Sequence, residues 1–187
     1  MSDGKTQVRL SGFGGQGIIL AGEILGMAVT LHEGRNAVLT QSFGPEARGG
    51  ACSADVVVSD ARIYYPCVTV PDVLVLMSEE AARTYGPNAA EGALVLVNED
   101  LVRTVPKRPD LRIHRIPATR LAEGLGRVMV ANIVMLGFIT ARAKLVSPDA
   151  MKKALLASVP PGTEKLNENA FRAGYEYEEQ LSVIGSR

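Results

Sequence analysis

The sequence predicts a single α/β domain over residues 1–187. Its doubly wound, mostly parallel sheet contains one antiparallel hairpin and precedes a helical C-terminal third. The first supporting observation is an apolar strand that runs directly into a glycine cluster and then an apolar helix, within residues 8–31. The second is that short apolar strands alternate with helical patterns, as in parallel sheets with helical crossovers. The third is that 187 residues, 47% of them hydrophobic, suffice for one substantial core.

The predicted strands are short, apolar and bounded by turn residues. They are Thr6–Ser11, Ala37–Gln41, Ala51–Ser59, Arg62–Tyr65, Val73–Met77, Ala93–Val97 and Arg112–Ile116. Ser59-Asp60-Ala61 joins the third run to the fourth, which predicts a tight antiparallel hairpin. Val73–Met77 and Ala93–Val97 are continuous apolar runs, as expected of strands that are buried on both faces.

The predicted helices follow the first glycine cluster and then fill the later part of the chain. They are Gln16–Leu31, Glu79–Tyr85, a short helix from Thr119 to Gly124 or Gly126, Val128–Leu145, a helix from Ser147 through Val159, and Glu164–Leu181. Ser78 is a candidate cap of the second helix. Pro148 lies near the first turn of the fifth helix, where the missing N–H of proline costs nothing. Val128–Leu145 is apolar on most of its circumference, which predicts a central position in the packing.

Charge and hydropathy exclude several functional classes. Twenty basic residues balance twenty acidic ones, so no long-range field favours nucleic acid or an anionic membrane. The segment Met1–Gln7 has no apolar secretory core, and the longest apolar stretch, Val128–Ile139, is too short to span a bilayer. We therefore expect a cytoplasmic protein that binds neither nucleic acid nor a membrane.

The cysteines and histidines do not form a metal-binding pattern. Cys52 and Cys67 are not a C-x-x-C pair, and His32 and His114 are the only histidines. A zinc site or iron–sulfur cluster built from this chain alone is therefore not expected. Both cysteines are predicted to be buried, unreactive thiols that do not pair with each other.

The first glycine loop is the turn between the first predicted strand and helix. Gly12, Gly14 and Gly17 match G-x-G-x-x-G, and such a turn lets a phosphate approach the backbone at a helix N-terminus. The dinucleotide-binding form of this motif also needs an acidic residue after the second strand, where this chain has Thr40-Gln41-Ser42. An ordinary NAD site is therefore disfavoured, while another anion remains a candidate. The alternative is that the glycines only permit a tight crossover.

The second glycine loop, residues 42–50, follows the next predicted strand. It places Ser42, Glu46 and Arg48 among three glycines, at the edge where open α/β sheets bind ligands or partners. The Arg48 guanidinium can hold a carboxylate or phosphate, so we interpret this loop as functional. The alternative is a Glu46–Arg48 salt bridge in a surface turn, which would stabilise the fold by only about 0–1 kcal/mol.

Two helices of the C-terminal third carry residues that need a partner. Asn132 interrupts an apolar helix, and an unpartnered buried amide would cost about 1–3 kcal/mol, so we expect backbone, a neighbouring loop or a ligand to satisfy it. Gly137, on the same helix, is expected to admit another backbone. Phe171, Tyr175 and Tyr177 on the last helix are interpreted as core, although such a helix also suits docking to another subunit.

Four motifs together resemble one known family. They are Gly12-Phe13-Gly14-Gly15-Gln16-Gly17, Ser42-x-Gly44-x-Glu46-x-Arg48-Gly49-Gly50, Asn132-x-x-x-Leu136-Gly137 and Asn167-x-x-Ala170-Phe171-x-x-Gly174-Tyr175. The chain is similar over nearly its whole length to the gamma subunit of 2-oxoacid:ferredoxin oxidoreductases, which act on pyruvate, 2-oxoglutarate, branched-chain 2-oxoacids or indolepyruvate. The motifs give the candidate cofactor-binding residues Gly12, Gly14, Gly15, Gln16, Gly17, Ser42, Gly44, Glu46, Arg48, Gly49, Gly50 and Asn132. They give no catalytic or metal-binding residue.

The resemblance implies a Rossmann-like domain that contacts alpha and beta subunits, with a ferredoxin-like delta subunit as a further candidate partner. In such complexes thiamine diphosphate attacks the 2-oxoacid, CO₂ leaves, iron–sulfur clusters pass electrons to ferredoxin, and coenzyme A accepts the acyl group. We expect this chain to bind none of these cofactors alone and to be inactive alone. Its two glycine loops are expected to form the subunit contact and are candidates to border the coenzyme A path. We favour 2-oxoglutarate, or 2-oxoacids in general, as the substrate.

Two other functional classes remain open at this point. One is a free-standing nucleotide-binding oxidoreductase that uses the first glycine loop. The other is a non-catalytic scaffold subunit that binds no small molecule, because glycine loops serve interfaces as readily as phosphates.

Overall fold

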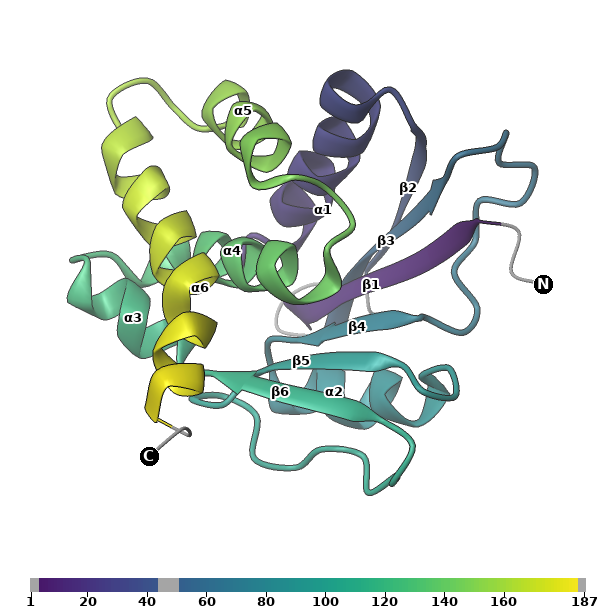
Figure 1. Cartoon of the computed structure of the whole chain (residues 1–187). Coiled ribbons are helices and arrows are strands. Elements are labelled where there is room, and N and C mark those ends of the chain that lie inside the picture. Colours follow the sequence, from purple (N-terminus) through teal and green to yellow (C-terminus); the bar gives the residue numbers. More distant parts are fainter. Residues whose placement is uncertain (1–3, 44–50, 185–187) are drawn as a thin grey trace.

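Six strands form a single mixed sheet in the part of the chain that the structure describes. The computed structural model describes residues 4–43 and 51–184, with side chains up to residue 177. The strands are β1 (Lys5–Phe13), β2 (Asn36–Phe43), β3 (Ala51–Ser59), β4 (Val73–Leu76), β5 (Leu94–Asn98) and β6 (Arg112–Ile116). Their order across the sheet is β2-β3-β1-β4-β5-β6 (Figure 1).

Strand β3 runs against the direction of the other strands of this sheet. It is antiparallel to both of its neighbours, β1 and β2, whereas β1, β4, β5 and β6 pair in parallel. The carboxyl ends of β1, β2, β4, β5 and β6 therefore lie at one edge of the sheet, called here the carboxyl edge. The predicted fold class, a mostly parallel α/β sheet that contains an antiparallel hairpin, is confirmed.

The predicted position of the hairpin is wrong. Strand β3 pairs with β2 and β1, and Arg62–Tyr65 form no strand. All nine residues of β3 are buried, so its backbone groups need partners on both sides, and β1 and β2 supply them. Tyr64 and Tyr65 are instead exposed, and their rings lie under the cations of Arg62 and Lys5. The segment after β3 is thus a surface connection.

The helices begin and end close to the predicted positions. They are α1 (Ile18–Met27), α2 (Glu79–Tyr85), α3 (Ala118–Gly124), α4 (Ala131–Ala143), α5 (Pro148–Ser158) and α6 (Glu164–Ile184). A π-helical segment, Ala28–His32, continues α1, and short 3₁₀ turns occupy Gly86–Asn88 and Val128–Val130. The predicted cap at Ser78 is confirmed, because its side chain accepts a hydrogen bond from the N–H of Ala81.

Helices cover both faces of the sheet (Figure 1). Helices α1, α4, α5 and α6 pack on one face and form the larger core with alternate residues of the strands. Helix α2 lies on the other face, where its Ala82 joins a smaller core that contains Leu74, Leu76 and Val95. The central position predicted for the apolar helix is confirmed, since residues 131–140 of α4 are all buried.

Helices α4 and α6 pack with their backbones in close contact. A Cβ atom added to Gly137 would overlap the carbonyl oxygen of Phe171, and one added to Gly174 would overlap the carbonyl oxygen of Val134. The role predicted for Gly137 is therefore confirmed, and Gly174 performs the same role from the opposite helix. Phe171 is buried, in agreement with the predicted core face of the last helix.

A buried ion pair joins β1 to β3 on the face that α2 covers. Arg9 donates from Nε to Asp55 Oδ1 over 2.8 Å and from Nη2 to Asp55 Oδ2 over 2.5 Å, and the two side chains are only 11% and 10% exposed. Nη2 also donates to the carbonyl oxygen of Val68, and the guanidinium lies 5.0 Å from the centre of the Tyr85 ring. Hydrogen bonding to Asp55 raises the pKa of Arg9, so the cation is retained despite its burial.

The two cysteines differ in exposure. Cys52 is buried on β3, as predicted, and burial raises the pKa of its thiol. The predicted burial of Cys67 is wrong: it lies exposed in the surface connection between β3 and β4, because Arg62–Tyr65 do not form the strand that would have placed it against the core. Within residues 4–43 and 51–184, no helix is long and apolar enough to cross a membrane, and no group of three potential metal ligands is present.

Candidate functional site

The first glycine loop connects β1 to α1 at the carboxyl edge. Its conformation is held by Gln16, whose Oε1 accepts a hydrogen bond from the N–H of Phe13 over 2.9 Å. Gln16 Nε2 donates to the carbonyl oxygen of Met77, also over 2.9 Å. This side chain therefore fastens the loop to the end of the neighbouring strand β4. Gln16 was predicted to bind a cofactor, and in the structure both polar atoms of its side chain form hydrogen bonds within the fold.

The glycines of this loop fall into two groups. A Cβ atom at Gly12 would overlap Gln16, and one at Gly17 would overlap Asn132. Gly17 also has a φ of 70°, in the left-handed region that favours glycine. Gly14 and Gly15 are exposed, and a Cβ atom at either would meet nothing within 4 Å. The fold thus requires Gly12 and Gly17. Gly14 and Gly15 form the open tip of the loop, although Gly15, with a φ of 97°, also has a backbone conformation that favours glycine.

Asn132 links the start of α4 to the start of α1. Its Nδ2 donates to the carbonyl oxygen of Gly17 over 3.1 Å, and its Oδ1 accepts from the N–H of Ile133 over 2.9 Å. The residue is 4% exposed. Of the partners left open by the sequence, backbone groups satisfy this amide, one of them in the glycine loop, and Asn132 fixes that loop against the C-terminal helices.

The second glycine loop starts from the same edge of the sheet. Ser42 is exposed near the end of β2, whereas the predicted site residues Gly44, Glu46, Arg48, Gly49 and Gly50 lie outside the described residues. Gly12 and Phe43 both pair with Cys52, on opposite sides of β3. Because adjacent strands are about 4.8 Å apart, the two loops leave the sheet about 10 Å from each other.

Strand β3 separates the first glycine loop from the end of β2. In dinucleotide-binding folds the second strand lies beside the first, so that its acidic residue reaches the ribose. Here the end of β2 is one strand further away and carries Thr40-Gln41-Ser42 in place of an acid. This geometry weighs against a dinucleotide site.

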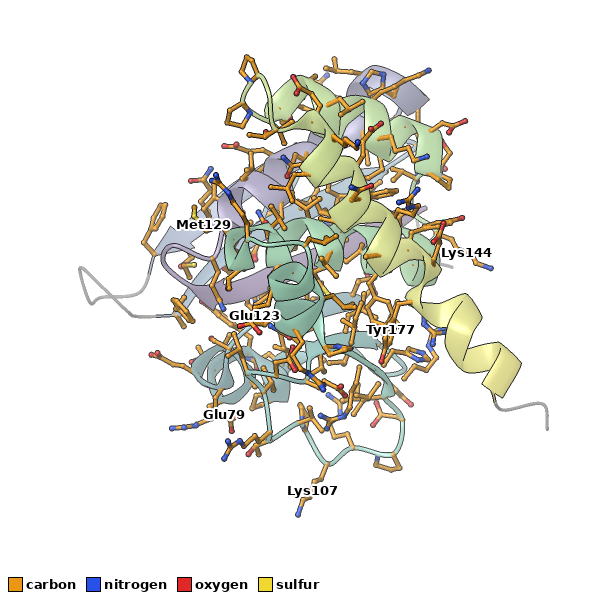
Figure 2. All side chains as sticks on the ribbon, turned by 90° about the vertical axis from the view of Figure 1, so that its left-hand side faces the viewer. Glu79, Lys107, Glu123, Met129, Lys144 and Tyr177 are labelled. Carbon is orange, nitrogen blue, oxygen red and sulfur yellow. The ribbon has the colours of Figure 1, made fainter. Side chains whose placement is uncertain are left out.

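An apolar cavity of about 330 Å³ opens beside the first glycine loop. We call it the socket, and it is lined by Phe13, Gly15, Gln16, Met77, Leu101, Thr119, Val128, Met129 and Ala131. Met129 is 79% exposed and Val128 is 50% exposed. Figure 2 shows Met129 beside the ribbon of the β1–α1 loop, on the outside of the molecule. The socket therefore has an apolar wall that projects into solvent.

The polar groups of the socket are few and are mostly held by the fold. Thr119 lines the socket, and its Oγ1 accepts a hydrogen bond over 2.9 Å from Nδ2 of Asn98, which is buried at the end of β5 and does not itself line the cavity. Asn98 Oδ1 has no hydrogen-bond partner among the described residues. Close by, Arg120 pairs with both Glu99 and Asp100, so its cation is satisfied within the chain and this cluster keeps a net charge of −1. The cavity suits an apolar side chain better than a charged ligand.

Most of the socket was not anticipated from the sequence. Val128 was predicted to begin a helix, and Met129 and Leu101 were not recognised as surface residues. Their apolar character suggested core, since nothing in a local pattern shows which apolar side chains remain uncovered. Gly126 and Arg127 indicate a break in the chain before Val128, and this break was the one local sign that Val128 and Met129 lie outside the long helix.

The comparisons with known proteins agree with one another. The family model described as "Pyruvate ferredoxin/flavodoxin oxidoreductase" matches residues 7–177. The 2-oxoglutarate synthase subunit KorC of Methanocaldococcus jannaschii is 52% identical over 180 residues, which are 95% of this chain and 96% of the relative.

Solved structures also resemble this fold. The keto/oxoacid ferredoxin oxidoreductase gamma subunit from Geobacter sulfurreducens has a TM-score of 0.86 and 38% identity, covering 96% of this chain and 98% of that chain. The 2-oxoglutarate:ferredoxin oxidoreductase from Magnetococcus marinus has a TM-score of 0.82 at 21% identity, covering 95% of this chain and 31% of that chain. The second likeness supports the fold alone.

Proposed function

The chain belongs to the pyruvate ferredoxin/flavodoxin oxidoreductase family, and from this premise we propose that it is the gamma subunit of an oxidoreductase acting on 2-oxoglutarate. Relatives that carry the 2-oxoglutarate synthase name are 35–52% identical to it. The predicted membership of the gamma subunits of 2-oxoacid:ferredoxin oxidoreductases, as part of a multi-subunit enzyme, is confirmed. The reaction converts a 2-oxoacid and coenzyme A to acyl-CoA and CO₂ and passes two electrons to ferredoxin.

The role of this chain in that reaction is subunit contact at the carboxyl edge. The observation that carries this proposal is the socket, whose exposed Phe13, Leu101, Val128 and Met129 surround an apolar cavity. Exposed apolar patches with a cavity at their centre are typical of protein interfaces. The thiamine diphosphate and iron–sulfur clusters of the enzyme belong, in this proposal, to the alpha, beta and delta subunits.

The second glycine loop is proposed to border the coenzyme A path. The strand before it, β2, ends at the carboxyl edge, as β1 does before the first loop, and an arginine such as Arg48 is the type of residue that holds a phosphate. Replacing Arg48 with alanine is expected to raise the KM for coenzyme A at least several-fold while the complex still assembles. Unchanged assembly together with an unchanged KM would remove this part of the proposal.

The socket gives the sharper test of subunit contact. Met129→Asp places a charge on the exposed wall, and burying an unpaired charge in an interface is strongly unfavourable, so we expect the complex to lose this subunit during co-purification. Val70→Asp is the matched control, because Val70 is 46% exposed in the connection before β4, at the opposite edge of the sheet. Retention of the Met129→Asp chain at the level of the control would contradict the proposal.

The scaffold alternative is favoured by a specific observation. Gly12, Gln16, Gly17 and Asn132 all have partners within the fold, so the first glycine loop is explained without a ligand. Thermal unfolding of the isolated chain with and without coenzyme A distinguishes the two roles. A rise in Tm with coenzyme A, lost in Arg48→Ala, supports binding by this chain, whereas no shift supports the scaffold. Submicromolar binding of NAD, NADP or FAD by calorimetry would restore the free-standing oxidoreductase.

A further inference from the structure

The two outermost strands of the sheet, β2 and β6, differ sharply in charge. Strand β6 carries two arginines and a histidine among its five residues, and β2 carries no charged residue and no proline among its eight. Burial lowers the pKa of His114, helped by the cations Arg142 and Arg112, but Arg112 and Arg115 keep this edge cationic. Proteins use such charges on edge strands to prevent pairing with another chain. Charged residues therefore protect the outer strand β6 from pairing with another chain, whereas the outer strand β2 carries no such charges.

Strand β2 pairs with β3 on one side only, and no described segment pairs with its other side. At about 3.4 Å per residue its eight residues extend for about 27 Å, long enough to hold a second strand. Residues 37–40 are half-buried by the helical layer and the sheet, whereas Gln41, Ser42 and Phe43 are exposed. The unpaired backbone groups along this edge are a template for strand addition.

We propose that β2 pairs antiparallel with β2 of a second copy of this chain, so that two six-stranded sheets join into one of twelve strands. A two-fold axis perpendicular to the sheet produces this pairing and keeps α1 of both copies on the same face. The proposal does not depend on the proposed function, because the socket lies at the carboxyl edge and shares no residue with β2.

A second copy is favoured over another partner by the self-complementarity of this edge. An antiparallel two-fold brings the carboxyl end of one β2 next to the amino end of the other. Phe43, 70% exposed, stands at the carboxyl end, and Leu31, 70% exposed, stands in the π-helical segment ahead of the amino end. Each copy thus offers one uncovered apolar side chain at each end, and the two-fold matches Phe43 with the Leu31 side of its mate.

The middle of β2 can also pair with its symmetry mate, because it carries no charge. Under a two-fold axis, residues near the centre of the strand face themselves or a near neighbour. Val38, Leu39 and Thr40 occupy this centre, and none brings a like charge against its symmetry mate. A partner strand recognised by charge would instead meet no complementary group along β2.

The test measures the mass of the full chain in solution by sedimentation over a wide range of concentrations. We expect a reversible dimer of twice the 19.9 kDa chain mass. Thr40→Lys places two ammonium groups close to the axis and is expected to raise the dissociation constant of the dimer about tenfold or more. Thr84→Lys is the matched control, because Thr84 is exposed on α2, on the other face of the sheet, and the dimer is expected to persist.

A mixing experiment separates lost pairing from lost folding. Thr40→Glu alone is also expected to be monomeric, and because position 40 lies across from Asp55 of β3, the thermal unfolding of this variant is measured first to show that it is folded. An equal mixture of Thr40→Lys and Thr40→Glu is expected to recover the dimer through opposite charges. A wild-type chain that remains monomeric at every concentration would overturn the proposal. A dimer that withstands both substitutions would overturn it equally, because the contact would then lie on another surface.

Discussion

Replacement of Gly137 by alanine is expected to lower the free energy of unfolding by about 3 kcal/mol or more, at the upper end of overpacking effects. The added methyl group would overlap the carbonyl oxygen of Phe171 and would also come within 2.8 Å of the N–H of Tyr175. Both groups belong to the backbone of α6, so they cannot turn away as a side chain could. Helix α6 must shift as a whole and lose its packing against α4.

The matched control is the same substitution in a helix with free space. Gly26 lies within α1, and a Cβ atom there would meet nothing within 4 Å. Gly26→Ala is expected to stabilise the chain by about 0.5–1 kcal/mol, because alanine restricts the unfolded backbone more than glycine does. Urea unfolding at one protein concentration measures both variants. A Gly137→Ala variant as stable as wild type would show that the close contact of α4 and α6 is incorrect.

Replacing Arg9 with methionine is expected to cost about 3–5 kcal/mol of unfolding free energy. The methionine keeps much of the side-chain volume but leaves the buried Asp55 carboxylate without its partner, and the carbonyl oxygen of Val68 loses a donor. Arg35→Met is the control. Arg35, with a side chain 26% exposed, pairs with an Asp60 side chain that is 72% exposed and also donates to the carbonyl oxygen of Leu145. An exposed pair of this kind contributes only about 0–1 kcal/mol.

A double variant distinguishes a lost ion pair from general disruption. Arg9→Met combined with Asp55→Leu removes both charges, and buried ion pairs replaced by apolar residues often leave stability unchanged. We therefore expect the double variant to recover most of the stability that Arg9→Met loses, measured by the same urea titrations. A double variant less stable than either single variant would contradict this account of the pair.

Local sequence was sufficient to predict elements that are marked by a few neighbouring residues. Ser78 and Pro148 indicated where helices begin, and the apolar run Val73–Met77 indicated a buried strand. Asn132 indicated a side chain that needs a hydrogen-bond partner, and Gly137 indicated the close approach of another backbone. In each case the signal is a cap, a run or a polar interruption within a few residues. The same reasoning failed at Arg62–Tyr65, because a short turn such as Ser59-Asp60-Ala61 suggests a hairpin whether or not the segment after it pairs with the strand before it.

The sequence by itself determined the fold class, the family and the position of the first glycine loop, because these depend on residue types at short, fixed spacings. Only the tertiary structure decided that β3 lies between β1 and β2. It also decided that side chains of the fold pack against Gly12 and Gly17, and that Met129 and Phe43 remain exposed to solvent. The physical reason is that burial and strand pairing depend on which distant segments meet. An apolar residue has the same local signature in a core, in a socket or at an open edge.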